Sequence, residues 1–97
     1  MPESIATRSV VVTNPEGIHA RAAVVIAETV RRSKSRVIMI KDQERVEATD
    51  VLQLLAMGAG QGQRVEIEAA GPDAVAVLDA LEPLFAGQFG DEAKKSV

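Results

Sequence analysis

The chain has no cysteine, tryptophan or tyrosine, and its 97 residues include only two phenylalanines and one histidine. Disulfides and thiol chemistry are therefore excluded, which leaves the redox compartment open. We expect no metal site, because a lone histidine without cysteine cannot share the ligation with a second such residue. No apolar run approaches the roughly 20 residues of a membrane-spanning helix, and no signal peptide is recognisable. We therefore expect a cytoplasmic protein without membrane insertion.

Charge and size narrow the class of protein further. The formal net charge is -3 at pH 7, which argues against nucleic acid as a partner. Hydrophobic residues make up 46% of the chain and aromatic residues only 2%, so the core must be aliphatic. The length suits one domain with a modest core. We expect a single domain over residues 1–97, with its core at about 8–90 and with frayed ends that include Met1 to Thr7.

Hydrophobic periodicity predicts elements in the order βαββαβα. The predicted strands cover residues 8–13, 37–41, 44–47 and 64–70, and the predicted helices cover residues 20 to about 33, 49–57 and 73 to about 82. In residues 64–70, Val65, Ile67 and Ala69 alternate with glutamates, so one face of that strand is buried and the other is wet. This pattern favours an α+β open-faced sandwich: one antiparallel sheet with helices on one face.

Two of the predicted helices carry an apolar stripe along one side. In the first helix the stripe consists of Ala23, Ile26, Ala27 and Val30. In the last helix it consists of Ala74, Val75, Leu78, Leu81 and Phe85. Pro83 removes a backbone donor, so we expect a kink or an early end near Glu82. Basic residues gather where the first helix ends, at Arg31, Arg32, Lys34 and Arg36. They complement the helix dipole, or they form part of a docking surface for an acidic partner.

The single histidine lies in the stretch Asn14-Pro15-Glu16-Gly17-Ile18-His19-Ala20-Arg21, between a predicted strand and a predicted helix. Turn residues precede it, so His19 falls at or just before the first helical residue. Free backbone N–H groups and the helix dipole form an anion site there, to which Arg21 can add a guanidinium. A nucleophilic imidazole beside such a site suits phosphoryl transfer. A plain cap or surface role for His19 remains the alternative.

Gly17-Ile18-His19-Ala20-Arg21 resembles the phosphorylation motif of HPr, the histidine-containing phosphocarrier of the phosphoenolpyruvate-dependent sugar phosphotransferase system. The resemblance covers roughly residues 8 to 91. It implies the same sandwich fold and a phosphoryl carrier that is not a turnover enzyme and needs no cofactor. His19 would accept phosphate on Nδ1 from enzyme I and pass it to a IIA-type protein. Arg21 would attend the phosphate, and the backbone N–H groups of Ala20 and Arg21 would complete the site.

Two positions depart from the family pattern. The motif often continues with proline after the arginine, whereas this chain has Ala22, which keeps the helix start but changes local rigidity. Many family members also carry a regulatory serine at the start of the second helix, where this chain has Asp50. Asp50 is a candidate N-cap, with Thr49 as the alternative. We expect the serine-kinase switch to be absent or replaced by a fixed negative charge, with Thr49 as a weaker phosphorylation site.

Docking in the family uses apolar surface around the histidine and the second helix. By position this indicates Ile18, Ala22, Val25, Val51, Leu52 and Leu55. Residues 58–62 are read as a connector, because Gly58-Ala59-Gly60-Gln61-Gly62 lacks the Lys-Ser/Thr of a phosphate-binding loop. A competing function is a regulatory binding module that engages a transcriptional regulator or an enzyme through the Asp50 surface. A third is a small structural domain without phosphate chemistry. We expect a monomer, because a small free carrier suits transient exchange between two partners.

Overall fold

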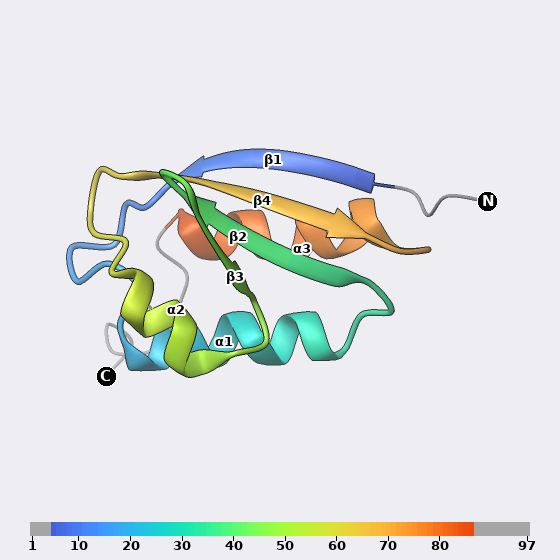
Figure 1. Cartoon of the computed structure of the whole chain (residues 1–97), viewed down its shortest axis with the longest axis horizontal. Coiled ribbons are helices and arrows are strands. Elements are labelled where there is room, and N and C mark those ends of the chain that lie inside the picture. The colour runs from blue at the N-terminus through green and yellow to red at the C-terminus, as the bar shows by residue number, and fades with distance from the viewer. Residues whose placement is uncertain (1–4, 87–97) are drawn as a thin grey trace, which may run out of the picture.

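A computed structural model describes residues 5–86. Over this range, the chain forms a four-stranded antiparallel sheet in the order β1-β4-β2-β3, together with three helices. The elements are β1 (Ile5–Val11), α1 (Ala20–Arg31), β2 (Arg36–Lys41), β3 (Glu44–Glu47), α2 (Val51–Met57), β4 (Arg64–Ala70) and α3 (Ala74–Phe85). The helices lie against one face of the sheet (Figure 1). The predicted βαββαβα order and open-faced α+β sandwich are confirmed.

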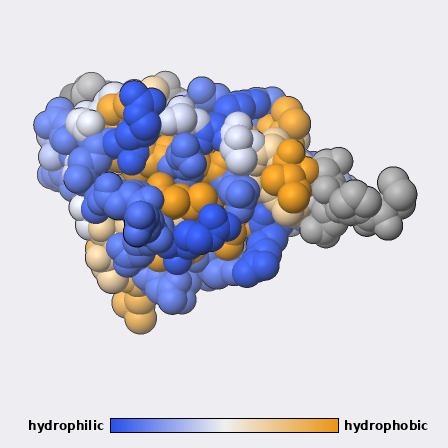
Figure 2. Space-filling model, turned by 45° about the horizontal axis from the view of Figure 1, so that its top comes forward, coloured by the Kyte–Doolittle hydropathy of each residue, from blue (hydrophilic) through white to orange (hydrophobic). Residues whose placement is uncertain are grey.

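The core lies between the sheet and the helices and is aliphatic except for Phe85. In β4, Val65, Ile67 and Ala69 are buried, as their alternation predicted. The predicted stripe of α1 is buried along its whole length. The opposite face of the sheet is mostly hydrophilic with small hydrophobic groups between (Figure 2). There, Arg36 pairs with Glu47 and Arg45 pairs with Glu68.

β1 begins earlier than the sequence predicted, at Ile5 instead of Arg8, and it ends at Val11. Its pairing with β4 explains the difference, because Ile5 lies opposite Ala70 and the ladder continues to Val11 opposite Arg64. The expectation of a frayed end is therefore wrong for residues 5–7. Residues 1–4 lie outside the described residues.

The sequence predicted a kink or an early end near Glu82. α3 continues through Pro83 to Phe85, so the early end is wrong. Proline lacks one N–H group, but the buried side chains of Leu81 and Phe85 hold the last turn against the core. The predicted stripe also needs one correction. Val75 is 56% exposed, and Val77 is buried in its place. Gly87, Gly90 and the Lys94-Lys95 pair lie outside the described residues. Within residues 5–86, no helix is long and apolar enough to cross a membrane.

Candidate functional site

The loop between β1 and α1 is held by its own hydrogen bonds. Asn14 is buried, and its side-chain amide donates to the Gly17 carbonyl at 2.9 Å. The Gly17 N–H group donates back to the Asn14 carbonyl at 2.9 Å. Gly17 has a φ of +67°, and a Cβ added there would lie 2.5 Å from the carbonyl oxygen of Ala59. Only glycine therefore allows this loop to pack so closely on its neighbour.

That neighbour is the glycine-rich segment between α2 and β4. Its Ala59 carbonyl accepts the N–H of Ile18 at 3.0 Å, and its Gln63 carbonyl accepts the N–H of Val12 at 2.9 Å. The Gly62 N–H donates to the Val12 carbonyl at 2.7 Å. The two loops meet at the same end of the sheet (Figure 1). The connector thus also braces the histidine loop, a role that the sequence analysis missed.

His19 is the N-cap of α1, which begins at Ala20. Its backbone is extended, and its Nδ1 accepts a hydrogen bond from the N–H of Ala22 at 3.4 Å. Its carbonyl accepts the N–H of Ala23 at 2.9 Å. The side chain is 23% exposed. The predicted position at the helix start is confirmed. The nitrogen that caps the helix, Nδ1, is also the nitrogen predicted to accept the phosphoryl group, since its lone pair is directed at the helix end.

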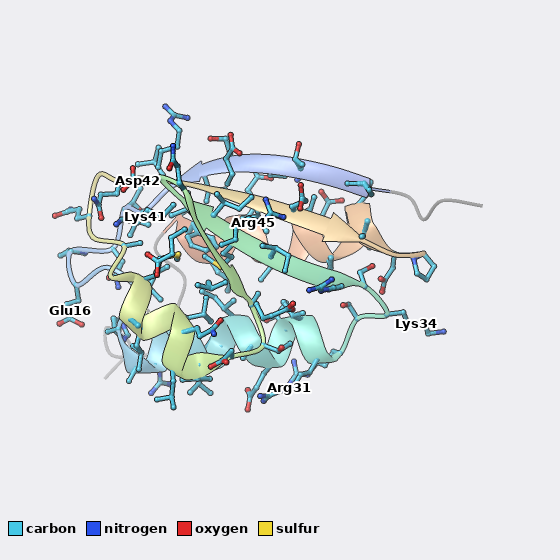
Figure 3. The ribbon with its side chains drawn as sticks, viewed as in Figure 1. Glu16, Arg31, Lys34, Lys41, Asp42 and Arg45 are labelled. Atoms are coloured by element: carbon cyan, nitrogen blue, oxygen red, sulfur yellow. The ribbon has the colours of Figure 1, made fainter. Side chains whose placement is uncertain are left out.

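The other ring nitrogen is in a different environment. Nε2 of His19 is buried and has no hydrogen-bond partner among the described residues. The carboxylate of Glu16 lies nearby, with 3.7 Å between its Oε1 and Nε2. Glu16 sits on the β1–α1 loop and its side chain is 70% exposed (Figure 3). Sequence reasoning did not single out Glu16. The signal that could have identified it is its position three residues before a histidine that caps a helix.

Arg21 is the second residue of α1 and is exposed. Among the described residues it has no ion-pair partner, so its guanidinium can turn toward an anion at the helix start. The N–H groups of Ala20 and Arg21 lie in the first turn, where a helix provides no internal acceptors. His19, Arg21 and these N–H groups all belong to the start of α1, and a shared phosphate site there stays a prediction.

Asp50 is the N-cap of α2. Its carboxylate accepts the N–H of Gln53 at 3.1 Å, so the assignment of the cap to Asp50 instead of Thr49 is confirmed. The Thr49 carbonyl accepts a hydrogen bond from the Arg31 side chain at 3.1 Å, which ties the end of α1 to the start of α2.

The basic residues at the end of α1 have separate surroundings. Arg36 pairs with Glu47 on the sheet, whereas Arg31 contacts the start of α2. Figure 3 shows Arg31 at the end of α1 and Lys34 farther along, on the connection to β2. Arg31 and Arg36 are therefore engaged within the chain, and a docking role for this basic group stays a prediction.

The predicted docking residues divide by burial. Leu52 is 77% exposed, and Val25, Val51 and Leu55 are half-buried, so all four can contribute surface. Ile18 and Ala22 are buried, at 5% and 0% exposure, and their assignment to a docking surface is wrong. Both side chains belong to the core cluster beneath the histidine loop. Val24 on α1 is 41% exposed and was not among the predicted docking residues.

Known proteins match this chain over most of its length. A family model described as the PTS HPr component phosphorylation site matches residues 6–87. The phosphocarrier protein HPr of Treponema pallidum is 39% identical, over 88% of this chain and 97% of that protein. The phosphocarrier protein NPr of Klebsiella oxytoca is 34% identical, over 88% of this chain and 96% of that protein.

A solved structure matches as well. The crystal structure of HPr-C-His from Thermoanaerobacter tengcongensis aligns with a TM-score of 0.82 at 28% identity, and the alignment covers 88% of this chain and 96% of that one. With the fold, the helix-capping histidine and these matches in agreement, the chain belongs to the HPr family of phosphocarrier proteins of the phosphotransferase system.

Proposed function

We propose that His19 carries the phosphoryl group, that phosphorylated enzyme I donates it, and that a IIA-type protein accepts it. The placement of His19 Nδ1 at the start of α1 is the observation that carries this proposal. There Nδ1 accepts the Ala22 N–H and lies among the backbone donors of the first turn. Such a helix end favours a phosphate-sized anion.

The chemistry needs a nucleophilic nitrogen and a site for the group that it receives. In the charging step, the lone pair of Nδ1 forms a bond to phosphorus, and the bond from phosphorus to the donor atom breaks with its electron pair returning to the donor. The long 3.4 Å hydrogen bond from Ala22 is weak enough to be given up. The N–H groups of Ala20 and Arg21 and the Arg21 guanidinium then bind the phosphoryl oxygens. Discharge to the acceptor reverses these bond changes.

The proposed docking surface is the apolar area beside His19. It consists of Val24, Val25, Val51, Leu52 and Leu55 on α1 and α2. These two helices contact each other, so their exposed side chains can form a continuous surface. The acceptor's identity decides whether the carrier serves sugar uptake or a regulatory phosphorelay.

A regulatory binding module is the second candidate function. It is favoured by the exposure of Leu52 at 77%, two residues after the negatively charged cap Asp50. In this role a transcriptional regulator would bind the α2 surface without phosphoryl transfer.

Phosphoenolpyruvate and purified enzyme I from the same organism distinguish the two functions. Intact mass of the wild-type chain should rise by one phosphoryl group that is labile in acid and stable in alkali. His19→Ala should show no gain in mass, while its amide NMR spectrum shows that the variant is still folded. No gain in the wild type would refute the carrier function and leave the Asp50 surface as the site to study.

A further inference from the structure

The two ring nitrogens of His19 have unequal partners. Nδ1 accepts the Ala22 N–H, so Nδ1 holds the lone pair and a neutral ring carries its one proton on Nε2. That proton then belongs to a buried atom with no hydrogen-bond partner among the described residues. A buried donor left without an acceptor is unfavourable. The ring therefore needs a nearby acceptor for Nε2–H.

Glu16 supplies such an acceptor. Its Oε1 lies 3.7 Å from Nε2, and its side chain is 70% exposed and can rotate. A change of about 1 Å brings the two atoms within hydrogen-bond distance. We infer that Glu16 is a positioning residue, which holds the proton on Nε2 through its carboxylate and so keeps Nδ1 as the phosphoryl acceptor. This inference rests on the proposed function of His19.

The reaction gives this carboxylate a second effect. Attack through Nδ1 leaves the Nε2 proton on the ring, so the ring becomes an imidazolium bonded to a phosphoryl group while the donor recovers its electron pair. The positive charge that develops on the ring lies beside the negative charge of Glu16. The arrangement resembles the carboxylate partners that orient histidines in other sites. Arg21 remains available to the phosphoryl oxygens, because it has no ion-pair partner among residues 5–86.

Three substitutions separate the parts of this role. Glu16→Ala removes the acceptor and the charge, whereas Glu16→Gln keeps an acceptor oxygen and removes the charge. Glu66→Gln is the matched control: it removes one negative charge from the exposed face of β4, away from α1. Nitrogen-15 NMR of the free proteins reports which ring nitrogen carries the proton. Enzyme I assays, with the carrier as the varied substrate, give kcat and KM.

We expect the ratio of the Nε2–H to the Nδ1–H tautomer to fall about fivefold in Glu16→Ala, and kcat to fall by a similar factor with KM unchanged. Glu16→Gln should retain the wild-type tautomer ratio with an intermediate kcat, and Glu66→Gln should match the wild type. The isosteric Gln variant keeps the test valid if the Ala variant disturbs the loop.

An unchanged tautomer ratio in Glu16→Ala would overturn the inference. So would a raised KM with an unchanged kcat, which would make Glu16 a docking residue. A wild-type chain that gains no phosphoryl group would refute the proposed function separately, because the NMR measurement needs no partner protein.

Discussion

Replacing Gly17 by alanine tests whether the contact between the two loops builds the histidine site. The backbone at Gly17 has a φ of +67°, where an alanine costs about 1–2 kcal/mol. The added Cβ would also lie 2.5 Å from the Ala59 carbonyl oxygen and 3.0 Å from Gly60 Cα. Both are backbone atoms, so relief requires the loops to separate, which adds roughly 1–3 kcal/mol. We expect Gly17→Ala to lower the free energy of unfolding by about 2–5 kcal/mol.

Gly62→Ala is the matched control. Gly62 has a φ of +87°, but a Cβ there would meet no atom within 4 Å. Gly62→Ala should lower the free energy of unfolding by only about 1–2 kcal/mol, the cost of placing alanine at a positive φ. Urea unfolding followed by circular dichroism measures both losses, and phosphorylation by enzyme I should slow only in Gly17→Ala. Equal losses of stability in the two variants would refute the claim that the loop contact determines the need for glycine at position 17.

Three further predictions concern other parts of the molecule. Asp50→Ala should lose about 1 kcal/mol of unfolding free energy, measured in urea, because a helix cap is removed. Asp50→Ser should keep most of the stability that the cap provides. Labelling by an HPr serine kinase should appear in Asp50→Ser but not in the parent chain. Leu52→Asp should raise KM with enzyme I about tenfold or more, because a charge enters an apolar contact. Val75→Asp, on α3, is its control and should leave KM unchanged. Hydrogen bonds from the Ser35 hydroxyl and a neighbouring backbone N–H hold the pKa of Asp73 below its ordinary value of 3.8. Because this pKa is lower in the folded chain than in the unfolded chain, the ionised Asp73 stabilises the fold above about pH 3.8. This stabilisation is lost as the pH falls through the folded-state pKa. Thermal unfolding of Asp73→Asn should therefore be less sensitive to pH than that of the wild type from about pH 5 to about pH 2; a parallel decline in both would contradict this role.

The parts of the fold that follow from periodicity were predictable from sequence. The alternation of β4 and the stripe of α1 each report directly which side chains are buried. The position of His19 at a helix start followed from turn residues before it and helix formers after it. The cap role of Asp50 followed from its short acceptor side chain.

The errors arose where a distant partner decides the local structure. β1 extends to Ile5 because β4 continues to Ala70 opposite it. α3 passes through Pro83 because Phe85 must reach the core, and the Phe85 carbonyl accepts from the Thr13 hydroxyl at 2.7 Å. Ile18 and Ala22 lie beside the site in sequence, yet their side chains point into the core. Proximity to a functional residue therefore does not predict exposure.

The His19 ring has two neighbours, Ala22 and Glu16, whose contacts with its nitrogens sequence reasoning did not predict. At position 22 the sequence suggested only a change in rigidity relative to the proline of many relatives. Proline has no N–H group, whereas Ala22 donates one to Nδ1. That hydrogen bond, although long, favours the lone pair on Nδ1 and the proton on Nε2. The inferred role of Glu16, whose carboxylate lies 3.7 Å from Nε2, is to accept that proton. The two residues therefore act on opposite sides of one ring, and a change at either should alter the tautomer that the other favours.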